Sequence, residues 1–238
     1  MSILELENVS KSYGSTHVLE GVSLELRPTE AGQVGLFPEH AAMVPWLQDR
    51  VRAMAGHASA ATGGDPLPAV LHLFAYTGLG TLAMAAAGAA VTHVDSSRPT
   101  VAWARRNAER SGLHERPVRW IVDDAMAFAE REVRRGRRYA GVVLDPPTYG
   151  HGPGRRSWQL VGHLPELMAA CAALLEQRAF VLLTAHTPGV DPDRLADVLA
   201  AAMPRRASSI DRGDLFVATM DGRRLELGAF ARASAGAS

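Results

Sequence analysis

The sequence predicts an α/β fold: a doubly wound, mostly parallel sheet with helices on both faces and a C-terminal antiparallel hairpin. Three observations support it. Short apolar runs alternate with helix-like segments from residue 70 to residue 203. These runs are almost continuously apolar, as strands buried on both faces require. Near the end of the chain, Asp221-Gly222 separates two strand-like segments as a tight hairpin turn does.

Composition sets the limits for the function. The 238 residues suffice for one core, and 47% hydrophobic with 21% charged residues is typical of a globular chain. Lys plus Arg and Asp plus Glu are both 25, so a strongly cationic nucleic-acid binder is excluded at the whole-chain level. The single cysteine, Cys171, excludes an intrachain disulfide and a cysteine-rich zinc site. We expect a cytoplasmic protein without a signal peptide.

The stretch between Asp65 and Asp95 contains no charged residue except at its ends. It is long enough to span a bilayer, but its Ala- and Gly-rich composition and its Thr77–Gly80 turn argue against a spanning helix. We therefore predict a buried strand, loop, helix and strand here, and no membrane partner.

The N-terminal part is less regular. Residues 2–9 and 18–26 alternate in polarity like the strands of a hairpin, with a turn at 12–15. A helical stretch is predicted from Phe37-Pro38 to about residue 54. Composition changes near residue 27, after the only lysine. The predicted organisation is listed in chain order: an N-terminal hairpin segment at 1–26, an entry motif and helix at 27–56, a linker at 57–68, the main domain at 69–232 and a frayed tail at 233–238.

The main domain is built from alternating elements. The predicted strands are 70–74, 90–94, 118–122, 139–144 and 179–184. The predicted helices are 81–88, 98–111, 124–135, 158–176 and 191–203. The closing hairpin is predicted at 215–220 and 224–230.

In a doubly wound sheet, ligands bind beyond the carboxyl ends of the strands. The first strand ends in the small-residue loop 74–80, where a ligand can approach the backbone. Asp95 follows this loop at a spacing close to the roughly 20 residues that are typical of a carboxylate that binds a ribose. The third strand ends in Asp123-Asp124, where a carboxylate can accept an adenine amino group. Each residue taken alone can instead shape a turn or cap a helix.

The fourth strand ends in the most specific motif, Asp145-Pro146-Pro147-Thr148-Tyr149. Two successive prolines fix the backbone and remove amide donors, which leaves the carbonyls and Asp145 as acceptors for an incoming amino group. Tyr149 offers a ring on which a planar base can stack.

These motifs resemble a known family. LFAYTG, the strand-end Asp95, VDDA and LDPPTYG, in this order, resemble the class I S-adenosylmethionine (SAM)-dependent methyltransferases of the bacterial 23S ribosomal-RNA type. GLFPEH at 35–40 resembles the entry motif of that family, and the resemblance covers about residues 27–232. It implies a Rossmann-like methyltransferase fold, SAM as cofactor, and RNA, above all ribosomal RNA, as substrate.

The resemblance also implies roles for single residues. The implied cofactor-binding residues are Phe74, Ala75, Tyr76, Thr77, Gly78, Gly80, Asp95, Ser96, Asp123, Asp124 and Ala125. The implied catalytic residues are Asp145, Pro146, Pro147 and Tyr149. Tyr76 stands where a generic methyltransferase loop has another glycine.

Methyl transfer of this kind is an in-line displacement that needs no metal, so we expect no metal site. Relatives that methylate carbon 5 of cytosine use a cysteine after the fifth strand; here that place reads Thr184-Ala185-His186-Thr187, and Cys171 lies on an apolar helix face. A nitrogen or oxygen acceptor is therefore predicted. His186 is either a base or a hydrogen-bonded loop histidine.

Arginines gather in two places. Arg134, Arg135, Arg137 and Arg138 end a helix, where a solvated face is the simplest interpretation. Arg155 and Arg156 follow the Asp145 loop and suit phosphate contacts.

Residues 3–26 resemble the opening strands of ABC-transporter ATPases, with Tyr13 at the place of the adenine-stacking aromatic. No G-x-x-x-x-G-K-[ST] loop occurs in the sequence, and Pro146 stands where a catalytic Glu is needed, so ATP hydrolysis is rejected.

Three alternatives stay open at this point. The enzyme can methylate a small molecule or a protein; Gly78, Gly80 and Asp95 can serve an NAD-dependent oxidoreductase; or the chain is an inactive SAM-binding remnant. The sequence predicts neither the acceptor atom nor the oligomeric state.

Overall fold

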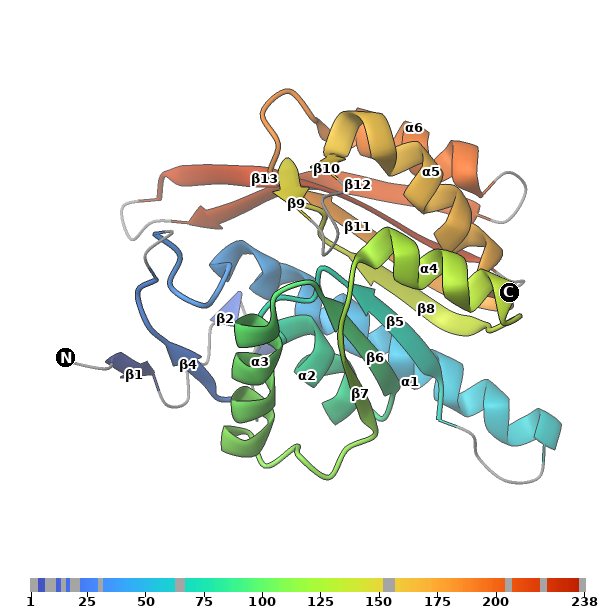
Figure 1. The fold of residues 1–238 in the computed structure, drawn as a ribbon, viewed down its shortest axis with the longest axis horizontal. Coiled ribbons are helices and arrows are strands. Elements are labelled where there is room, and N and C mark those ends of the chain that lie inside the picture. Colours follow the sequence, from blue (N-terminus) through green and yellow to red (C-terminus); the bar gives the residue numbers. More distant parts are fainter. Residues whose placement is uncertain are drawn as a thin grey trace.

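The computed structural model describes residues 4–6, 12–13, 16–17, 22–29, 32–62, 67–151, 157–203, 207–218 and 222–235 (Figure 1). The strands are β1 (Leu4–Leu6), β2 (Ser12–Tyr13), β3 (Thr16–His17), β4 (Leu24–Leu26), β5 (Ala69–Leu73), β6 (Ala90–Asp95), β7 (Val118–Val122), β8 (Tyr139–Leu144), β9 (Tyr149–His151), β10 (Ser157–Gln159), β11 (Leu175–Ala185), β12 (Ala207–Ala218) and β13 (Arg224–Ala235). The helices are the 3-10 helix η1 (Pro38–Met43) and the α-helices α1 (Val44–Thr62), α2 (Leu79–Ala86), α3 (Arg98–Arg110), α4 (Ala125–Arg134), α5 (Leu160–Ala173) and α6 (Pro192–Ala202).

Seven strands of the described chain form one sheet in the order β12-β13-β11-β8-β5-β6-β7. The pairings among β11, β8, β5, β6 and β7 are parallel, whereas β13 pairs antiparallel with both β11 and β12. The predicted fold class, a mostly parallel sheet closed by an antiparallel hairpin, is confirmed. The register aligns Leu73 with Leu144 and Leu144 with Leu183, so the segments that follow these strands lie at one edge of the sheet.

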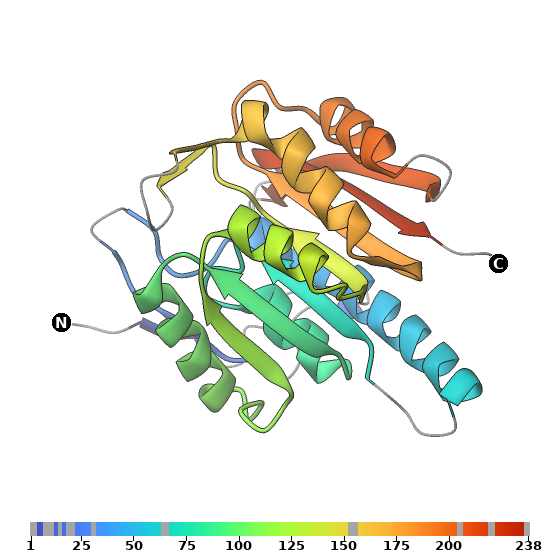
Figure 2. The same ribbon diagram turned by 45° about the vertical axis from the view of Figure 1, so that its right-hand side comes forward.

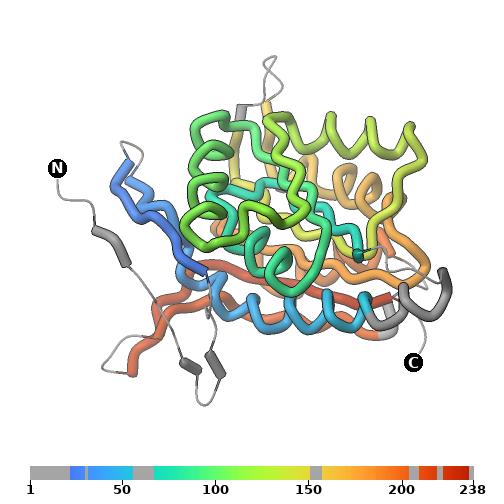
Figure 3. The backbone as a smooth tube through the Cα atoms, turned by 90° about the horizontal axis from the view of Figure 1, so that it is seen from below, coloured from blue at the N-terminus to red at the C-terminus, as the bar shows by residue number. Residues whose placement is uncertain are grey.

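Helices cover both faces of this sheet. Helices α4, α5 and α6 form one layer, seen side by side in Figure 2. Helix α1 lies against the opposite face, below the sheet in Figure 3, and packs on α2. Helix α3 joins α2 on that side through a cluster that contains Leu82, Ala108 and Leu113. The helices that follow β5 and β6 therefore lie on one face, and those that follow β7, β8 and β11 lie on the other, as a doubly wound sheet requires.

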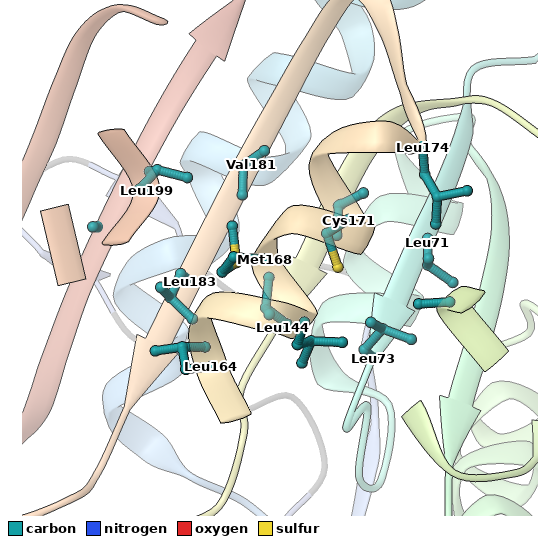
Figure 4. Close-up of a cluster of buried hydrophobic side chains, with 14 of the residues drawn as sticks. Leu71, Leu73, Leu144, Leu164, Met168, Cys171, Leu174, Val181, Leu183 and Leu199 are labelled. Carbon is teal, nitrogen blue, oxygen red and sulfur yellow. The ribbon is translucent and has the colours of Figure 1, made fainter. Parts of the chain in front are cut away.

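The core has a large cluster on each face of the sheet. Beneath α4, α5 and α6, buried side chains such as Leu71, Leu144 and Met168 pack together (Figure 4). On the α1 side, Phe180 is fully buried and meets Trp46 edge-on at 5.7 Å. Gly141 makes room for the Phe180 ring, since a Cβ at this glycine would collide with it. Removing either cluster would expose a whole sheet face.

Burial on both faces was predicted for every parallel strand, and β7 departs from it. Arg119 and Val122 are exposed because β7 is the edge strand and has a neighbour on one side alone. Within the stretch between Asp65 and Asp95, the described residues form β5, α2 and β6, as predicted. In the described part of the chain, no helix combines the length and the apolar character needed to cross a membrane.

The N-terminal segments pair as an antiparallel set. Strand β1 pairs with β4, and β2 pairs with β3. Strand β1 lies within the predicted strand 2–9, and β4 within the predicted strand 18–26; residues 2–3, 7–9 and 18–21 of these strands, and 14–15 of the predicted turn, lie outside the described residues. Residues 22–26, just before the predicted boundary at residue 27, pack against α3, and Val22 is buried.

Three further predictions are corrected. Helix α1 continues to Thr62, so the linker predicted at 57–68 is helical in its first half. The helix predicted from 158 begins at Leu160, because Ser157–Gln159 pairs antiparallel with β9. The predicted frayed tail is paired through Ala235, which lies opposite Ala179 in β11. Arg155, Arg156 and Asp221 lie outside the described residues.

Candidate active site

Two neighbouring cavities open at the carboxyl ends of the parallel strands. The first is lined by Leu36, Phe37, His40, Met43, Val44, Leu47, His72, residues 74–80, Val143, Asp145, Leu182 and Thr184. The second is lined by Phe74, Val94, Asp95, Ser96, Asp123, Asp124, Ala125, Pro147, Gly150 and Trp158. Phe74 borders both cavities, so they adjoin.

The predicted site residues divide between these cavities. Every residue predicted to bind the cofactor lines one of them, and Phe74 lines both. Of the predicted catalytic residues, Asp145 lines the first cavity and Pro147 the second. Pro146 is buried, and Tyr149 is 68% exposed on β9; neither lines a cavity. The stacking role of Tyr149 therefore stays a prediction.

The loop after β5 has an unusual backbone. Phe74 and Tyr76 have positive φ angles of 53° and 48°, and Gly78 has a φ of 94°. Non-glycine residues rarely adopt this left-handed conformation, which costs of order 1–3 kcal/mol at each position and clusters at functional sites. The strain at Tyr76 explains why a glycine is expected there.

Asp95 holds this loop in place. Its Oδ2 accepts a hydrogen bond from the Tyr76 amide at 3.0 Å, and its Oδ1 accepts one from the Ser97 amide at 2.9 Å. Burial raises the pKa of Asp95, and the two amide hydrogen bonds oppose this rise. Each carboxylate oxygen keeps a second acceptor site, available to hydroxyl groups in the second cavity.

Residues before η1 and a side chain of α3 hold the same loop by hydrogen bonds. The Thr77 hydroxyl donates to the Gly35 carbonyl at 2.7 Å, and the Asn107 side chain donates to the Thr77 carbonyl at 2.9 Å. Asn107 is itself held by the Glu25 amide, which donates to its Oδ1 at 2.8 Å. Sequence reasoning missed Asn107, because nothing in the sequence distinguishes it from any other polar helix residue.

Replacing Gly78 with alanine is expected to weaken, at least about 10-fold, the binding of the SAM-type cofactor that the sequence resemblance implies. An added Cβ would lie 3.2 Å from Cβ of Ala104, on a backbone with a φ of 94°. The left-handed conformation also costs about 1–2 kcal/mol of stability. Calorimetric titration with S-adenosylhomocysteine (SAH) and thermal unfolding measure the two effects.

Gly88→Ala is the matched control, because Gly88 has a φ of 102° and open space around its Cβ position. It should lose similar stability and keep its SAH affinity. Equal affinity loss in both variants would contradict a specific role of the 74–80 loop.

The two aspartates after β7 have different partners. Asp124 is the N-cap of α4, where its Oδ1 accepts the Ala127 amide at 2.9 Å. Asp123 forms an ion pair with Arg131, and its Oδ1 accepts the Asp124 amide. Both carboxylates border the second cavity while they serve the local structure.

Trp158 closes the second cavity on the side of the Asp145 loop. Its Nε1 donates to the Pro147 carbonyl at 2.7 Å, and its ring lies 5.4 Å from that of Phe74. Sequence reasoning placed Trp158 in a helix; its position in the stretch after the double proline was the available signal.

At the polar end of the first cavity, Asp145 is surrounded by donors. Its Oδ1 accepts the Thr184 hydroxyl at 2.6 Å and lies 3.3 Å from Nε2 of His186, and its Oδ2 lies 3.7 Å from Nε2 of His40. Burial alone would raise the pKa of Asp145, but the two histidines and Thr184 outweigh it and lower the pKa to about 2. Asp145 is therefore an ionised acceptor at neutral pH. The role of His40 was missed, although the GLFPEH motif contains it.

A buried chain of side chains backs the first cavity. Thr81 Oγ1 lies 2.8 Å from Nδ1 of His72 and 2.9 Å from Nδ1 of His93. Burial lowers the pKa of His72 to about 3 and that of His93 well below its usual value. Both rings are neutral and hold the strand ends by hydrogen bonds alone.

Tyr76 lines the first cavity, and its buried hydroxyl lies near the Gly35 backbone without completing a well-formed hydrogen bond to any described residue. Such a group costs about 1–3 kcal/mol unless a ligand or water satisfies it. Together, the cavities suit a ligand with a hydroxyl-bearing planar part beside Asp95 and a polar part beside Tyr76.

Comparison with known proteins agrees with this geometry, although no protein-family profile matches the chain. A SAM-dependent methyltransferase from Agrobacterium tumefaciens is 35% identical and superposes with a TM-score of 0.82, over 94% of this chain and 71% of that one. SMU.776, a methyltransferase structure in complex with SAH, is 16% identical with a TM-score of 0.69, over 90% of this chain and 54% of that one, and shows the fold alone.

Among curated proteins, the ribosomal RNA large subunit methyltransferase K/L of Methylococcus capsulatus is 44% identical over 82 residues, or 34% of this chain. The match spans 11% of the length of that relative. The Agrobacterium methyltransferase, 35% identical over 94% of this chain, favours a methyltransferase over the oxidoreductase alternative. This chain belongs to the SAM-dependent methyltransferases.

Proposed function

We propose that this protein transfers the methyl group of SAM to a base of RNA, with ribosomal RNA as the favoured substrate. The observation that carries the proposal is the pair of adjoining cavities, with Asp95 in one and the ionised Asp145 in the other. The name of the Methylococcus relative supports an RNA substrate.

The residues of the two cavities fit SAM. Asp95 would accept the ribose hydroxyls, residues 123–125 would border the adenine, and the 74–80 loop that lines the first cavity would face the amino-acid part. SAM supplies an electrophilic methyl group on a sulfonium sulfur. The left-handed 74–80 loop keeps the backbone amides of this cavity in fixed positions, which favours catalysis by orientation.

Asp145 defines the acceptor chemistry. An ionised carboxylate beside a double proline, which donates no amide hydrogen bonds, attracts an N–H group of the substrate. With SAM bound there, the amino nitrogen of the substrate would form its new bond to the methyl carbon as the carbon–sulfur bond breaks, and the sulfur would keep that electron pair as the thioether of SAH. The methylated nitrogen is then strongly acidic, so its proton passes to the Asp145 carboxylate and on to water.

The site contains no cysteine thiol that could serve as a covalent nucleophile. Cys171, the single cysteine of the chain, is fully buried on α5 among Met168, Leu174 and neighbouring aliphatic side chains (Figure 4). Burial raises its pKa to about 12, so it carries no thiolate at neutral pH.

Cys171→Ala is therefore expected to leave methyl transfer unchanged within a factor of two. It should lower the free energy of unfolding by about 1 kcal/mol, because the lost sulfur leaves a small cavity. Chemical unfolding and a methyl-transfer assay measure both. A loss of transfer in a variant that still binds SAH would contradict the proposed chemistry.

The decisive experiment is transfer of tritiated methyl from SAM to purified ribosomal RNA, to transfer RNA and to a small-molecule extract. Label in ribosomal RNA supports the proposal, and nuclease digestion with chromatography identifies the base. Label in the small-molecule fraction alone would replace RNA as substrate. SAH binding without any transfer would leave a SAM-binding remnant.

A further inference from the structure

Three segments of the chain bring ionisable side chains together at the polar end of the first cavity. His40 comes from η1, Asp145 follows β8, and His186 follows β11. Nε2 of His186 lies 3.0 Å from Nε2 of His40 and 3.3 Å from Oδ1 of Asp145. His40 and Asp145 line the cavity, whereas His186 does not. His186 thus contacts both polar groups that a substrate would meet.

The hydrogen bonds fix the protons of His186. Its Nδ1 lies 2.7 Å from the Leu227 carbonyl, which can only accept, so Nδ1 carries a hydrogen. Two nitrogen lone pairs cannot face each other at 3.0 Å, so one further proton lies between the two Nε2 atoms. If that proton is on His186, the ring is an imidazolium and His40 is its neutral acceptor.

The surrounding charges place the proton on His186. Asp145 faces Nε2 at 3.3 Å, and the buried Glu39 of η1 faces Nδ1 at 3.4 Å. Two further ionisable groups lie close by. His40 contacts His186 directly, and His72 of β5 lies near Asp145 and His40. Burial opposes the charge, but Asp145, Leu227 and Glu39 together raise the pKa of His186 to about 9, whereas burial lowers that of His40.

We propose that His186 is a positioning residue, a cation that fixes the Asp145 carboxylate and the His40 ring at the substrate end of the first cavity. Thr184 donates to Oδ1 and the charged His186 ring lies 3.3 Å from the same oxygen, whereas Oδ2 has only the longer contact with His40 at 3.7 Å, which leaves Oδ2 available to a substrate donor. A protonated His186 cannot accept the substrate proton, so the interpretation of His186 as the base is replaced. The kinetic part of this inference rests on the proposed methyl transfer.

The same atoms raise a second interpretation, a divalent metal ion in place of the shared proton. His40, His186 and Glu39 each bring a possible ligand atom within 4.8 Å of the others. However, Glu39 and Asp145 approach opposite nitrogens of the His186 ring, and Nδ1 is already bonded to Leu227. A metal ion would therefore have to replace the Nδ1 hydrogen bond to Leu227, or use Nε2, the nitrogen that Glu39 does not approach, so these contacts favour the proton.

The first test needs no substrate. Nuclear magnetic resonance of the histidine rings in the wild-type protein, with SAH added and metal removed by chelation, should show one ring that titrates near pH 9. Its resonances should vanish in His186→Gln, and its pKa should fall toward 6.5 in Asp145→Asn. A His186 ring that titrates at or below 6.5 in the wild type would overturn the proposal.

The second test separates positioning from binding. His186→Phe removes both donors and should lower kcat at least about 10-fold with an unchanged KM for SAM. His186→Gln restores a neutral donor toward Asp145 and should recover part of kcat. Wild-type activity should fall above about pH 9, where His186 loses its proton, and the Gln variant should lack this alkaline fall. His114→Gln, at an exposed site paired with Glu115, is the matched control.

The outcomes distinguish this inference from the proposed function. In one outcome, the wild-type protein transfers no methyl group while its His186 ring titrates near pH 9. This result would refute the proposed function and support the ion pair between His186 and Asp145. Equal kcat in wild type, Phe and Gln variants, each binding SAH, overturns the positioning role. Stoichiometric Zn²⁺ binding that disappears in both His40→Gln and His186→Gln also overturns it, in favour of a metal site.

Discussion

Replacing Asp95 with alanine is expected to reduce the affinity for SAH about 100-fold or more. The wild-type carboxylate accepts the Tyr76 and Ser97 amides and retains acceptor sites toward the second cavity. Hydrogen bonds to a charged group contribute about 1.5–3 kcal/mol each, so the loss of two ribose contacts alone accounts for a factor of about 100. The freed loop then loses its left-handed conformation and weakens binding further.

Isothermal titration calorimetry with SAH measures this effect. Asp197→Ala is the control, since Asp197 lies exposed on α6, away from both cavities. An Asp95→Ala protein that remains folded and binds SAH as tightly as the wild type would remove Asp95 from the cofactor site. It would leave Asp95 as a residue that only stabilises the loop.

The fold was predictable because its signals are local. Strands β7 and β8 have the predicted bounds, β5 is shifted by one residue and β6 is one residue longer, since each is an apolar run between turn residues. Chain order then dictates a parallel sheet, because each crossover contains a helix. The exposure of Arg119 on β7 was not predictable from the run itself, as it depends on which strand lies at the edge.

The errors in the fold concern elements whose partners are distant in sequence. Ala233 and Ala235 look like a frayed Ala- and Ser-rich tail, yet they pair with β11 more than fifty residues earlier. The sequence of Ser157–Gln159 is typical of a helix start, but these residues form a strand because they pair with β9. Helix α1 extends beyond its predicted end because its alanines, which are good helix formers, outweighed a glycine.

The candidate site divides in the same way. The residues at strand ends, such as Asp95 and Asp145, follow from topology, since all carboxyl ends of a parallel sheet meet at one edge. His40 and Asn107 do not follow from it, because η1 and α3 approach the loop through packing that no local pattern specifies. Their roles emerge only from hydrogen bonds across large sequence separations.

Changing Asp145 to asparagine is expected to lower the methyl-transfer rate about 100-fold or more and to leave SAH affinity within about threefold. Asparagine keeps the shape of the side chain but removes the charge that attracts the substrate N–H and accepts its proton, and proton transfer of this kind contributes 10²–10⁴ in rate. His186 would keep Glu39 as its carboxylate neighbour. Single-turnover transfer with saturating SAM, next to calorimetry with SAH, separates chemistry from binding.

The acid side of the pH profile sharpens this prediction. Because the pKa of Asp145 is lowered to about 2, its carboxylate stays ionised above that pH and is lost only below it. Wild-type transfer should therefore show no acid limb from Asp145 between pH 5 and 8, and Asp145→Asn should be slow throughout this range. Asp49→Asn, an exposed pair member on α1, controls for a general charge effect. If Asp145→Asn instead loses SAH affinity and keeps its rate with bound cofactor, Asp145 belongs to the cofactor site, and the acceptor must be sought on the η1 side of the cavity.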